Sequence, residues 1–445
     1  MSDSVSSPGL RAHVTLVLCT VLHAFTHAYG SLLVPLYLLM TRSLALPGVG
    51  YASFIVTIYG LFTCVGSYPA GMLADRFDRK TILGIGLIGN ALAVVAMGLT
   101  HNYNLLILLG ILAGAFGTLF HPAANALIPE HYPASPGMAI GLLGIGSGVG
   151  FYAGPQFAGW RAQTAQWNIA GLSISDWQRP VIEAGVAGLI MGIVFLYVAR
   201  EVRGRKRRLA YEGTAQGNSG EIRAAAAPAR SNKGLGMRVA IMAAVLGCRD
   251  FAGLATLSLC SIYLQKAHNL DARRTGFILG AMMLVSVVVN PIAVWLSPGR
   301  RRLPTLATIL ILGGVVVATT PLWPVQHVLW ALCLFMTFQL GSYSVSDAAI
   351  LERVPSHVRG RVVGIFLTIA GTFAASSPWV MGFWTDRLGE RAHEVNAYLP
   401  IFGTLGGMMV VSSLAMPLIS ALGPAMGAGP RAIEETSAAT LEAVM

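Results

Sequence analysis

Charged residues are scarce in this sequence. They make up 11% of its 445 residues, whereas soluble proteins average about 25%. A chain with so few charges and with 55% hydrophobic residues is not expected to fold as a water-soluble globule. Common catalytic motifs are missing as well, because the sequence contains no P-loop, no His-Glu-x-x-His pair and no nucleophile elbow. We therefore expect no enzyme, no cofactor and no resident metal ion.

Long apolar runs fill most of the chain. A helical span needs about 20 mostly apolar residues to cross a hydrocarbon core of roughly 30 Å. Twelve runs have this length, and they cover residues 12–38, 49–74, 82–100, 103–128, 137–160, 180–199, 237–265, 272–297, 303–323, 326–351, 360–385 and 396–422. The first run is too long for a cleaved signal peptide. The pattern predicts an all-α membrane protein with twelve transmembrane helices.

The basic residues are distributed unevenly between the two sides of these spans. The net charge is +11, but most lysines and arginines fall in alternate loops. With a cytoplasmic N-terminus, 21 of them lie on the cytoplasmic side and eight on the other side. This asymmetry predicts that both termini are cytoplasmic and that the partner of the positive charge is a lipid bilayer, not nucleic acid. We expect a monomer in the plasma membrane, most simply a bacterial inner membrane.

The chain divides into two similar halves. Between Arg200 and Arg238 the apolar pattern stops, and a basic stretch runs into a segment rich in Ala, Gly and Ser. We expect a six-helix half at 1–200, a cytoplasmic linker at 201–236, a second six-helix half at 237–422 and a tail at 423–445. Parallel repeats of this kind build transporters. Glu130, Pro133, Gly137, Gly141, Gly148, Pro155 and Gly159 recur as Glu352, Pro355, Gly360, Gly364, Gly371, Pro378 and Gly382, at an offset of 222 or 223.

The loop after the second span carries the most specific motif. Its residues are Gly71, Asp75, Arg76, Arg79 and Lys80. They resemble the Gly-x-x-x-Asp-Arg-x-Gly-Arg-Arg signature of the major facilitator superfamily, with Asp78 in place of the second glycine. The resemblance implies a fold of two pseudo-symmetric six-helix halves and a loop that latches them on the cytoplasmic side. A carboxylate beside a helix N-terminus and a close helix approach at the small residue would fit that role. A simple positive-inside anchor is the alternative. The second-half equivalent, from Ser297 to Arg302, keeps only the basic end.

The fifth span is rich in glycine. Gly150, Gly154, Pro155 and Gly159 are similar to the antiporter motif of the same superfamily, with Ala158 in place of one glycine. Glycines at this spacing form a groove without side chains, and a proline bends the helix, so a neighbouring span can pack closely and pivot. Close packing without any pivoting is the alternative. The motif favours export.

Ionisable residues within the spans are few, and such residues are usually functional. His23 and His27 lie one turn apart in the first span, His121 lies in the fourth, Arg249 and Asp250 lie in the seventh, and Asp347 lies in the tenth. In the superfamily these four helices line the central cavity. The histidines could instead hydrogen-bond a neighbouring helix, and Asp347 could lie in interfacial water. Arg249 and Asp250 point about 100° apart on a helix, so we expect that they cannot easily pair while both face the cavity.

The stretch from Phe120 to Ala123 resembles the fosmidomycin-resistance branch of the superfamily, whose members are drug exporters. The helix-4 arginine of common proton-coupled exporters is absent, because Ala113 takes its place. Arginine stays protonated, so Arg249 cannot carry a coupling proton. We expect His27 and His121 to carry it, with Asp250 as the alternative.

These features predict a secondary transporter that works by alternating access, with proton-coupled export of a small organic molecule as the leading function. Import or facilitated diffusion of an organic anion, with Arg249 as its counter-charge, is the second possibility. The three histidines could also serve a divalent metal transporter, because imidazole binds such ions. A further alternative is that the chain is a receptor without transport activity, since a fold does not fix a function.

Overall fold

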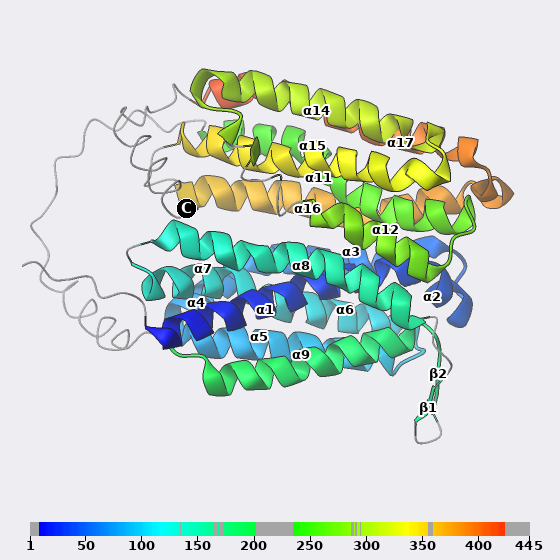
Figure 1. Cartoon of the computed structure of the whole chain (residues 1–445), viewed down its shortest axis with the longest axis horizontal. Coiled ribbons are helices and arrows are strands. Elements are labelled where there is room, and N and C mark those ends of the chain that lie inside the picture. Colours follow the sequence, from blue (N-terminus) through cyan, green and yellow to red (C-terminus); the bar gives the residue numbers. More distant parts are fainter. Residues whose placement is uncertain are drawn as a thin grey trace, which may run out of the picture.

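The computed structural model is a bundle of long helices (Figure 1). It describes residues 9–133, 135–162, 167–169, 172–201, 235–285, 289, 292–293, 295–354 and 359–422. Most of the predicted linker, 201–236, and the whole predicted tail, 423–445, lie outside these residues.

The helices follow the apolar runs closely. Their bounds are α1 Leu10–Leu32, α2 Tyr37–Ser43, α3 Val49–Val65, α4 Ser67–Arg76, α5 Arg79–Gly98, α6 Tyr103–Gly117, α7 Phe120–His131, α8 Pro136–Ala162, α9 Gln178–Val198, α11 Leu235–Lys266, α12 Ala272–Leu284, α14 Arg302–Thr319, α15 Val328–Leu351, α16 Arg359–Asp386, α17 Leu399–Val411 and α18 Ala415–Ser420. A short hairpin, β1 Trp167–Ile169 and β2 Leu172–Ile174, pairs Trp167 with Ile174 and was not predicted.

Among the described residues, ten helical stretches are long and apolar enough to span a membrane, and the bent pair α3 and α4 makes an eleventh. The remaining run, 272–297, begins with α12 and continues into residues that are partly outside the described ranges. The chain is therefore an all-α membrane protein apart from the short hairpin, and it is consistent with the twelve predicted spans.

Several spans are broken where the sequence weakens the helix. Pro35 lies in a short 3-10 helix, η1 Val34–Leu36, that separates α1 from α2. At Gly66 the chain bends by 46° between α3 and α4. Other helices begin at side-chain caps, as α6 does at Asn102, whose side chain accepts a hydrogen bond from Leu105 N at 3.1 Å. Local sequence thus sets where the spans break and begin.

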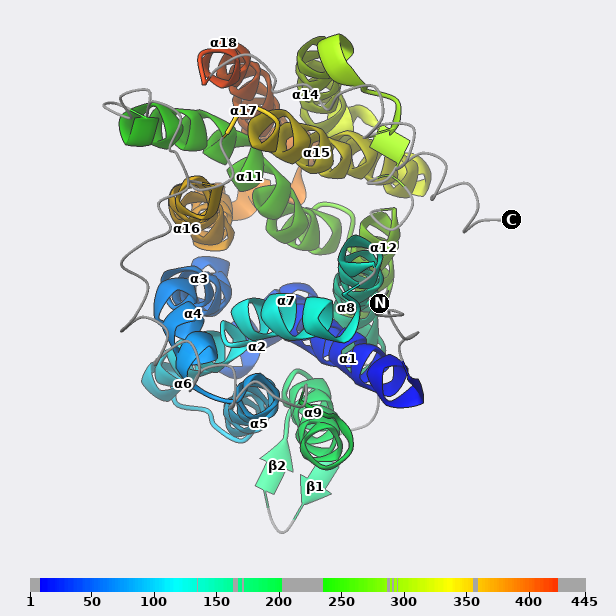
Figure 2. The ribbon, with the colours of Figure 1, turned by 90° about the vertical axis from the view of Figure 1, so that its left-hand side faces the viewer.

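The helices form two groups that face each other (Figure 2), α1 to α9 on one side and α11 to α18 on the other. We call the end where α9 stops and α11 starts the linker end, and the opposite end, next to β1 and β2, the hairpin end (Figure 1). Between the groups, α3 packs on α16 and α8 packs on α12.

Hydrogen bonds join the two groups at the hairpin end and along the middle. Ser261 Oγ donates to Val34 O at 2.6 Å, and Gln265 Nε2 donates to Pro35 O at 3.2 Å. Further along, Trp379 N donates to Thr57 Oγ1 at 3.0 Å. These contacts hold η1 and α3 of the first group against α11 and α16 of the second.

Candidate functional site

A cavity of about 680 Å³ lies between the two helix groups. This volume is in the range of pockets that hold small organic ligands. Its walls come from α8 and from the second-group helices α11, α12, α15 and α16. Most of the lining is apolar, and it includes Ile145, Phe151, Leu254, Met283, Met336 and Leu340. The cavity therefore offers an apolar surface with a few polar groups in its wall.

Glycines give α8 two different faces. Gly141 and Gly144 line the cavity, and an added Cβ there would meet no atom within 4 Å. Gly150 and Gly154 face α1 instead. A Cβ at Gly150 would collide with the carbonyl of Ala24, and one at Gly154 would lie 2.6 Å from the carbonyl oxygen of Ala28. The groove predicted from the glycine spacing is thus occupied by the α1 backbone.

The end of the same motif meets the other helix group. A Cβ at Gly159 would collide with the carbonyl of Ala272, at the start of α12. Pro155 lies inside α8, and its carbonyl lies against Gly276 of α12. The motif therefore lies where α8 contacts both α1 and the second helix group.

Asp250 is the carboxylate in the cavity wall. It accepts a hydrogen bond from Arg249 Nε at 2.7 Å. The two neighbours pair, but only Asp250 lines the cavity, which agrees with the expectation that they cannot easily pair while both face it. Arg249 itself is fully buried behind the wall.

The guanidinium of Arg249 has further partners on α15. Its Nη1 donates to Ser346 Oγ at 2.8 Å, and its carbon Cζ lies 4.0 Å from the centre of the Tyr343 ring. A cation over an aromatic face is stabilised by the ring quadrupole. Arg249 is thus held by Asp250, Ser346 and Tyr343, and it supports the Asp250 carboxylate from behind.

Two polar residues of the cavity wall were not identified from the sequence. Gln339 and Tyr343 both line the cavity, and Gln339 Nε2 donates to the backbone oxygen of Arg249 at 3.0 Å. The Oε1 atom of Gln339 is buried and has no hydrogen-bond partner in the described part of the chain. Their spacing of four residues on an apolar helix was the available signal. By contrast, Asp347 is exposed on α15 and is not among the cavity-lining residues.

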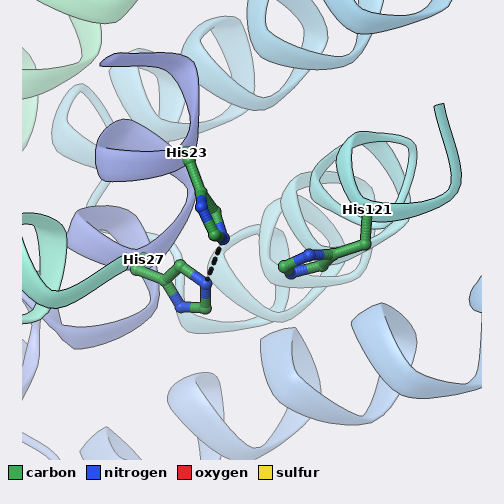
Figure 3. A group of neighbouring side chains, drawn as sticks. All are labelled: His23, His27 and His121. Carbon is green, nitrogen blue, oxygen red and sulfur yellow. Dashed lines mark hydrogen bonds between the residues drawn. The ribbon is translucent and has the colours of Figure 1, made fainter. Parts of the chain in front are cut away.

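His23, His27 and His121 come together between α1 and α7 (Figure 3). His23 Nδ1 lies 2.8 Å from Leu143 O, and the Nε2 atoms of His23 and His27 are 3.1 Å apart. The ring centre of His121 lies 5.2 Å from that of His23 and 5.5 Å from that of His27. None of the three lines the cavity, but the ring of His27 lies 4.5 Å from that of Phe151, which does.

The predicted gating loop connects α4 and α5. Arg79 Nη1 donates to Glu130 Oε1 at 2.5 Å and to Ala126 O at 2.7 Å, both on α7. Asp75 and Arg76 lie exposed in the last turn of α4, so Asp75 is near a helix C-terminus and not beside an N-terminus as expected. A Cβ at Gly71 would meet no atom within 4 Å, so no close helix approach occurs there.

Asp78 provides the helix cap of this loop. Its φ angle is −62°, which any residue adopts, so the turn does not need the family's second glycine. Its side chain accepts a hydrogen bond from Thr81 N at 2.8 Å, and the next residue but one, Lys80, donates its backbone N–H to Glu201 Oε2 at 2.9 Å. Although partial burial raises the pKa of the Asp78 carboxyl, the hydrogen bonds from Thr81 bring this pKa below its usual value.

Comparison with known proteins places this architecture in a family. The family model of the Major Facilitator Superfamily matches residues 16–378. The tetracenomycin C resistance and export protein of Streptomyces glaucescens is 32% identical over 156 residues, which are 34% of this chain and 27% of that protein. The multidrug resistance protein MdtG of Dickeya zeae is 34% identical over 145 residues, which are 32% of this chain and 35% of that protein. The matches thus span about a third of each curated relative.

Solved structures match over nearly the whole length. A bacterial homologue of the lysosomal transporter Spinster, in an inward-facing and occupied conformation, has a TM-score of 0.69 at 16% identity, over 94% of this chain and 96% of that one. A D-xylose–proton symporter has a TM-score of 0.70 at 15% identity, over 94% and 99%. At these identities the likeness shows the fold alone, while the family model over residues 16–378 shows that the chain is a multi-pass membrane protein that belongs to the Major Facilitator Superfamily.

Proposed function

We propose that this chain exports a small, largely apolar organic molecule in exchange for protons, by alternating access of its two helix groups. The observation that carries the proposal is the cavity between the groups, in which Asp250 is the carboxylate among the described lining residues and most of the lining is apolar. The names of two curated relatives, which describe resistance and export, support the direction. The uneven distribution of basic residues supports cytoplasmic termini in a bacterial inner membrane.

The cavity-lining residues Gly141 and Gly144 lie near the linker end of α8, away from the contacts that join the groups at the hairpin end. With cytoplasmic termini, this arrangement supports a state that accepts substrate from the cytoplasm. The opposite state would require the hairpin-end contacts to break and the linker end to close. The loop residues Asp75 and Arg79 are our candidates for that closure.

Asp250 is our candidate for the proton carrier. In the ionised state it accepts a hydrogen bond from Arg249. A proton that reaches its carboxylate from the extracellular side would remove the negative charge and weaken this ion pair, while Arg249 keeps Ser346 and Tyr343. Release of that proton to the cytoplasm would restore the ion pair and return the cavity wall to its original charge. Because Asp250 lines the cavity and the histidines do not, the geometry favours it as the carrier.

The ion pair between Arg249 and Asp250 also disfavours the alternative function, import of an organic anion. A substrate anion would have to displace Asp250 from a guanidinium that is fully buried behind the wall. Leaving a buried carboxylate without its partner is costly. This geometry supports export of a neutral or cationic molecule over uptake of an anion.

The test is transport in inside-out membrane vesicles with an imposed pH gradient. The probes are tetracenomycin C, chosen from the name of a relative, ethidium as an apolar cation, and an apolar anion of similar size. We expect accumulation that depends on an acidic vesicle lumen, is lost with a protonophore and excludes the anion. Asp250→Asn should lose gradient-driven accumulation, whereas Asp347→Asn should keep it. Accumulation of the anion alone, or accumulation that ignores the gradient, would overturn the proposal.

A further inference from the structure

The rings of His23, His27 and His121 lie next to one another in one cluster (Figure 3). One ligand atom can be chosen from each ring so that all three lie within 4.8 Å of one another. Two nitrogens bound to the same tetrahedral zinc ion, each at about 2.1 Å, are roughly 3.4 Å apart. The Nε2 atoms of His23 and His27 already lie 3.1 Å apart. The remaining adjustment is at His121, whose ligand atom lies within 4.8 Å of the other two.

The hydrogen bonds around the cluster fix the protons. A backbone carbonyl only accepts, so His23 Nδ1 carries the proton that it shares with Leu143 O at 2.8 Å. In a neutral ring this leaves the lone pair of His23 Nε2 pointing at the cluster. A histidine that binds a metal typically donates its other N–H to a carbonyl or a carboxylate in this way. His23 therefore has the tautomer and the support of a metal ligand before any ion binds.

The other two rings can complete the set. Without an ion, His27 Nε2 carries a proton that it donates to His23 Nε2, and coordination requires only that this proton move to His27 Nδ1. Neither ring nitrogen of His121 makes a hydrogen bond within the described part of the chain. Phe120 stacks on His23 at 4.7 Å, and Phe151 lies against His27 at 4.5 Å. The rings of His23 and His27 are thus packed against apolar neighbours that do not compete for the nitrogens.

We propose that His23, His27 and His121 form a binding site for a divalent transition-metal ion such as zinc, separate from the transport cavity. Three imidazoles are the ligand set of an open tetrahedral zinc site, in which the fourth position holds water or another small ligand. Nitrogen ligands select zinc, cobalt, nickel or copper over magnesium and calcium, which prefer oxygen. This inference goes beyond the proposed function, because it requires no proton coupling and no organic substrate.

The placement gives such an ion a structural consequence. His23 and His27 lie on α1, His121 lies on α7, and the carbonyl that orients His23 belongs to α8. A bound ion would hold α1 against α7 at a point where His27 contacts Phe151 of the cavity wall. The alternative is a cluster that only packs and hydrogen-bonds, with no affinity for metal.

The experiment is metal binding to the purified full-length chain in detergent, after removal of any polyhistidine tag and of bound metal with a chelator. Cobalt(II) is the probe, because a tetrahedral site gives intense visible absorption, and zinc should displace it. We expect one equivalent per chain, unaffected by excess magnesium. His121→Gln and His27→Gln should each weaken binding by at least about tenfold, because loss of even an outer-shell partner costs 10- to 100-fold. The matched control is His268→Gln, whose ring hydrogen-bonds Tyr263 outside the cluster.

A measurement on the unaltered chain keeps the result independent of variant folding. X-ray absorption of the zinc-loaded chain should show nitrogen ligands at about 2.0–2.1 Å, with the outer-shell scattering of three imidazoles. Binding that is absent, or that persists at full affinity in the His23, His27 and His121 triple variant, would overturn the site. An absorption spectrum typical of octahedral cobalt with oxygen ligands would do the same.

Discussion

Asp386, in the last turn of α16, accepts a hydrogen bond from the backbone nitrogen of Gly50 at 2.8 Å. Its second oxygen accepts from Val49 N at 2.9 Å, so one carboxylate of the second helix group caps the first turn of α3 in the first group. A negative charge at a helix N-terminus is stabilised by the unpaired N–H groups and by the helix dipole. The relationship joins the two groups at the hairpin end.

We predict that Asp386→Ala loosens this junction. Loss of a helix-capping side chain costs about 0.5–2 kcal/mol, and one to two kcal/mol corresponds to a factor of roughly 5–30 in an equilibrium. The first turn of α3 should therefore exchange its amide hydrogens several-fold faster, as measured by hydrogen–deuterium exchange of a peptide that covers 49–56. Glu390→Ala, a change at an exposed acidic residue nearby, is the control. Equal exchange in both variants would show that Asp386 does not hold the junction.

The two halves share an ion pair that follows the sequence repeat. Arg79 pairs with Glu130, and Arg302 pairs with Glu352, at the same offsets that relate the repeated residues. Arg302 was recognised only as the basic end of a degenerate loop, yet it contacts its glutamate as Arg79 does. Partly exposed pairs of this kind contribute about 0.2–1 kcal/mol each.

A double-mutant cycle on the first pair tests this relationship. Arg79→Ala and Glu130→Ala should each lower the thermal midpoint of the purified protein, and the double variant should lose less than the sum of the two. The coupling energy should be about 0.5–1 kcal/mol. The same cycle on Arg302 and Glu352 should give a similar value, whereas Arg79 combined with Glu352 should be additive. Strict additivity within the first pair would mean that the contact contributes nothing.

The predictable part of the fold is the local part. Apolar runs and capping residues such as Asn102 set the spans, because a helix in a membrane must satisfy its backbone internally. The glycine face of α8 also followed from spacing alone. The neighbours of each helix could not be predicted in this way, because the periodicity of a sequence does not indicate which helix packs against which. The pairing of Asp386 with Gly50, and the convergence of His121 on His23, depend on such neighbours.

The residues of the cavity wall show the same limit. Asp250 stood out as a charge within an apolar run, so the sequence was enough to select it. Gln339 and Tyr343 carry no charge, and their role depends on Arg249, which lies on another helix. The 100° angle between neighbours on a helix predicted that Arg249 and Asp250 cannot easily pair while both face the cavity, and only Asp250 faces it; the angle could not predict that they pair. The length and flexibility of the arginine side chain decide that contact.

We predict that Gly154→Leu disrupts the packing of α8. A Cβ at this position would lie 2.6 Å from Ala28 O and 2.7 Å from Ser31 Oγ, so a leucine must push α1 and α8 apart. Overpacking of this kind typically costs 1–3 kcal/mol. Lower thermal stability and loss of transport should follow. Gly137→Leu on the same helix is the matched control, because nothing lies within 4 Å of its Cβ position. Equal stability of the two variants would show that the groove is incidental.

The last prediction separates the two candidate proton carriers. Asp250 lines the cavity and pairs with Arg249, whereas His27 and His121 do not line it and His27 contacts the lining residue Phe151. A carrier must be reachable by protons from each side in turn and must affect the substrate that it is exchanged for. Asp250 is the better placed of the two for these requirements, because its carboxylate lines the cavity in which we propose that the substrate binds. The contact between the histidine cluster and the cavity wall is that of His27 with the Phe151 ring.

We therefore expect Asp250→Asn to abolish accumulation driven by a pH gradient while exchange of labelled for unlabelled substrate without a gradient continues. The double variant His27→Gln and His121→Gln should retain gradient-driven accumulation. Both rates are measured in the same vesicles with the amount of transporter matched by immunoblot. The reverse pattern, in which the histidine variant loses coupling and Asp250→Asn keeps it, would identify the histidines as the carriers. Loss of coupling in both variants, with exchange intact in each, would mean that the proton passes through the cluster on its way to Asp250.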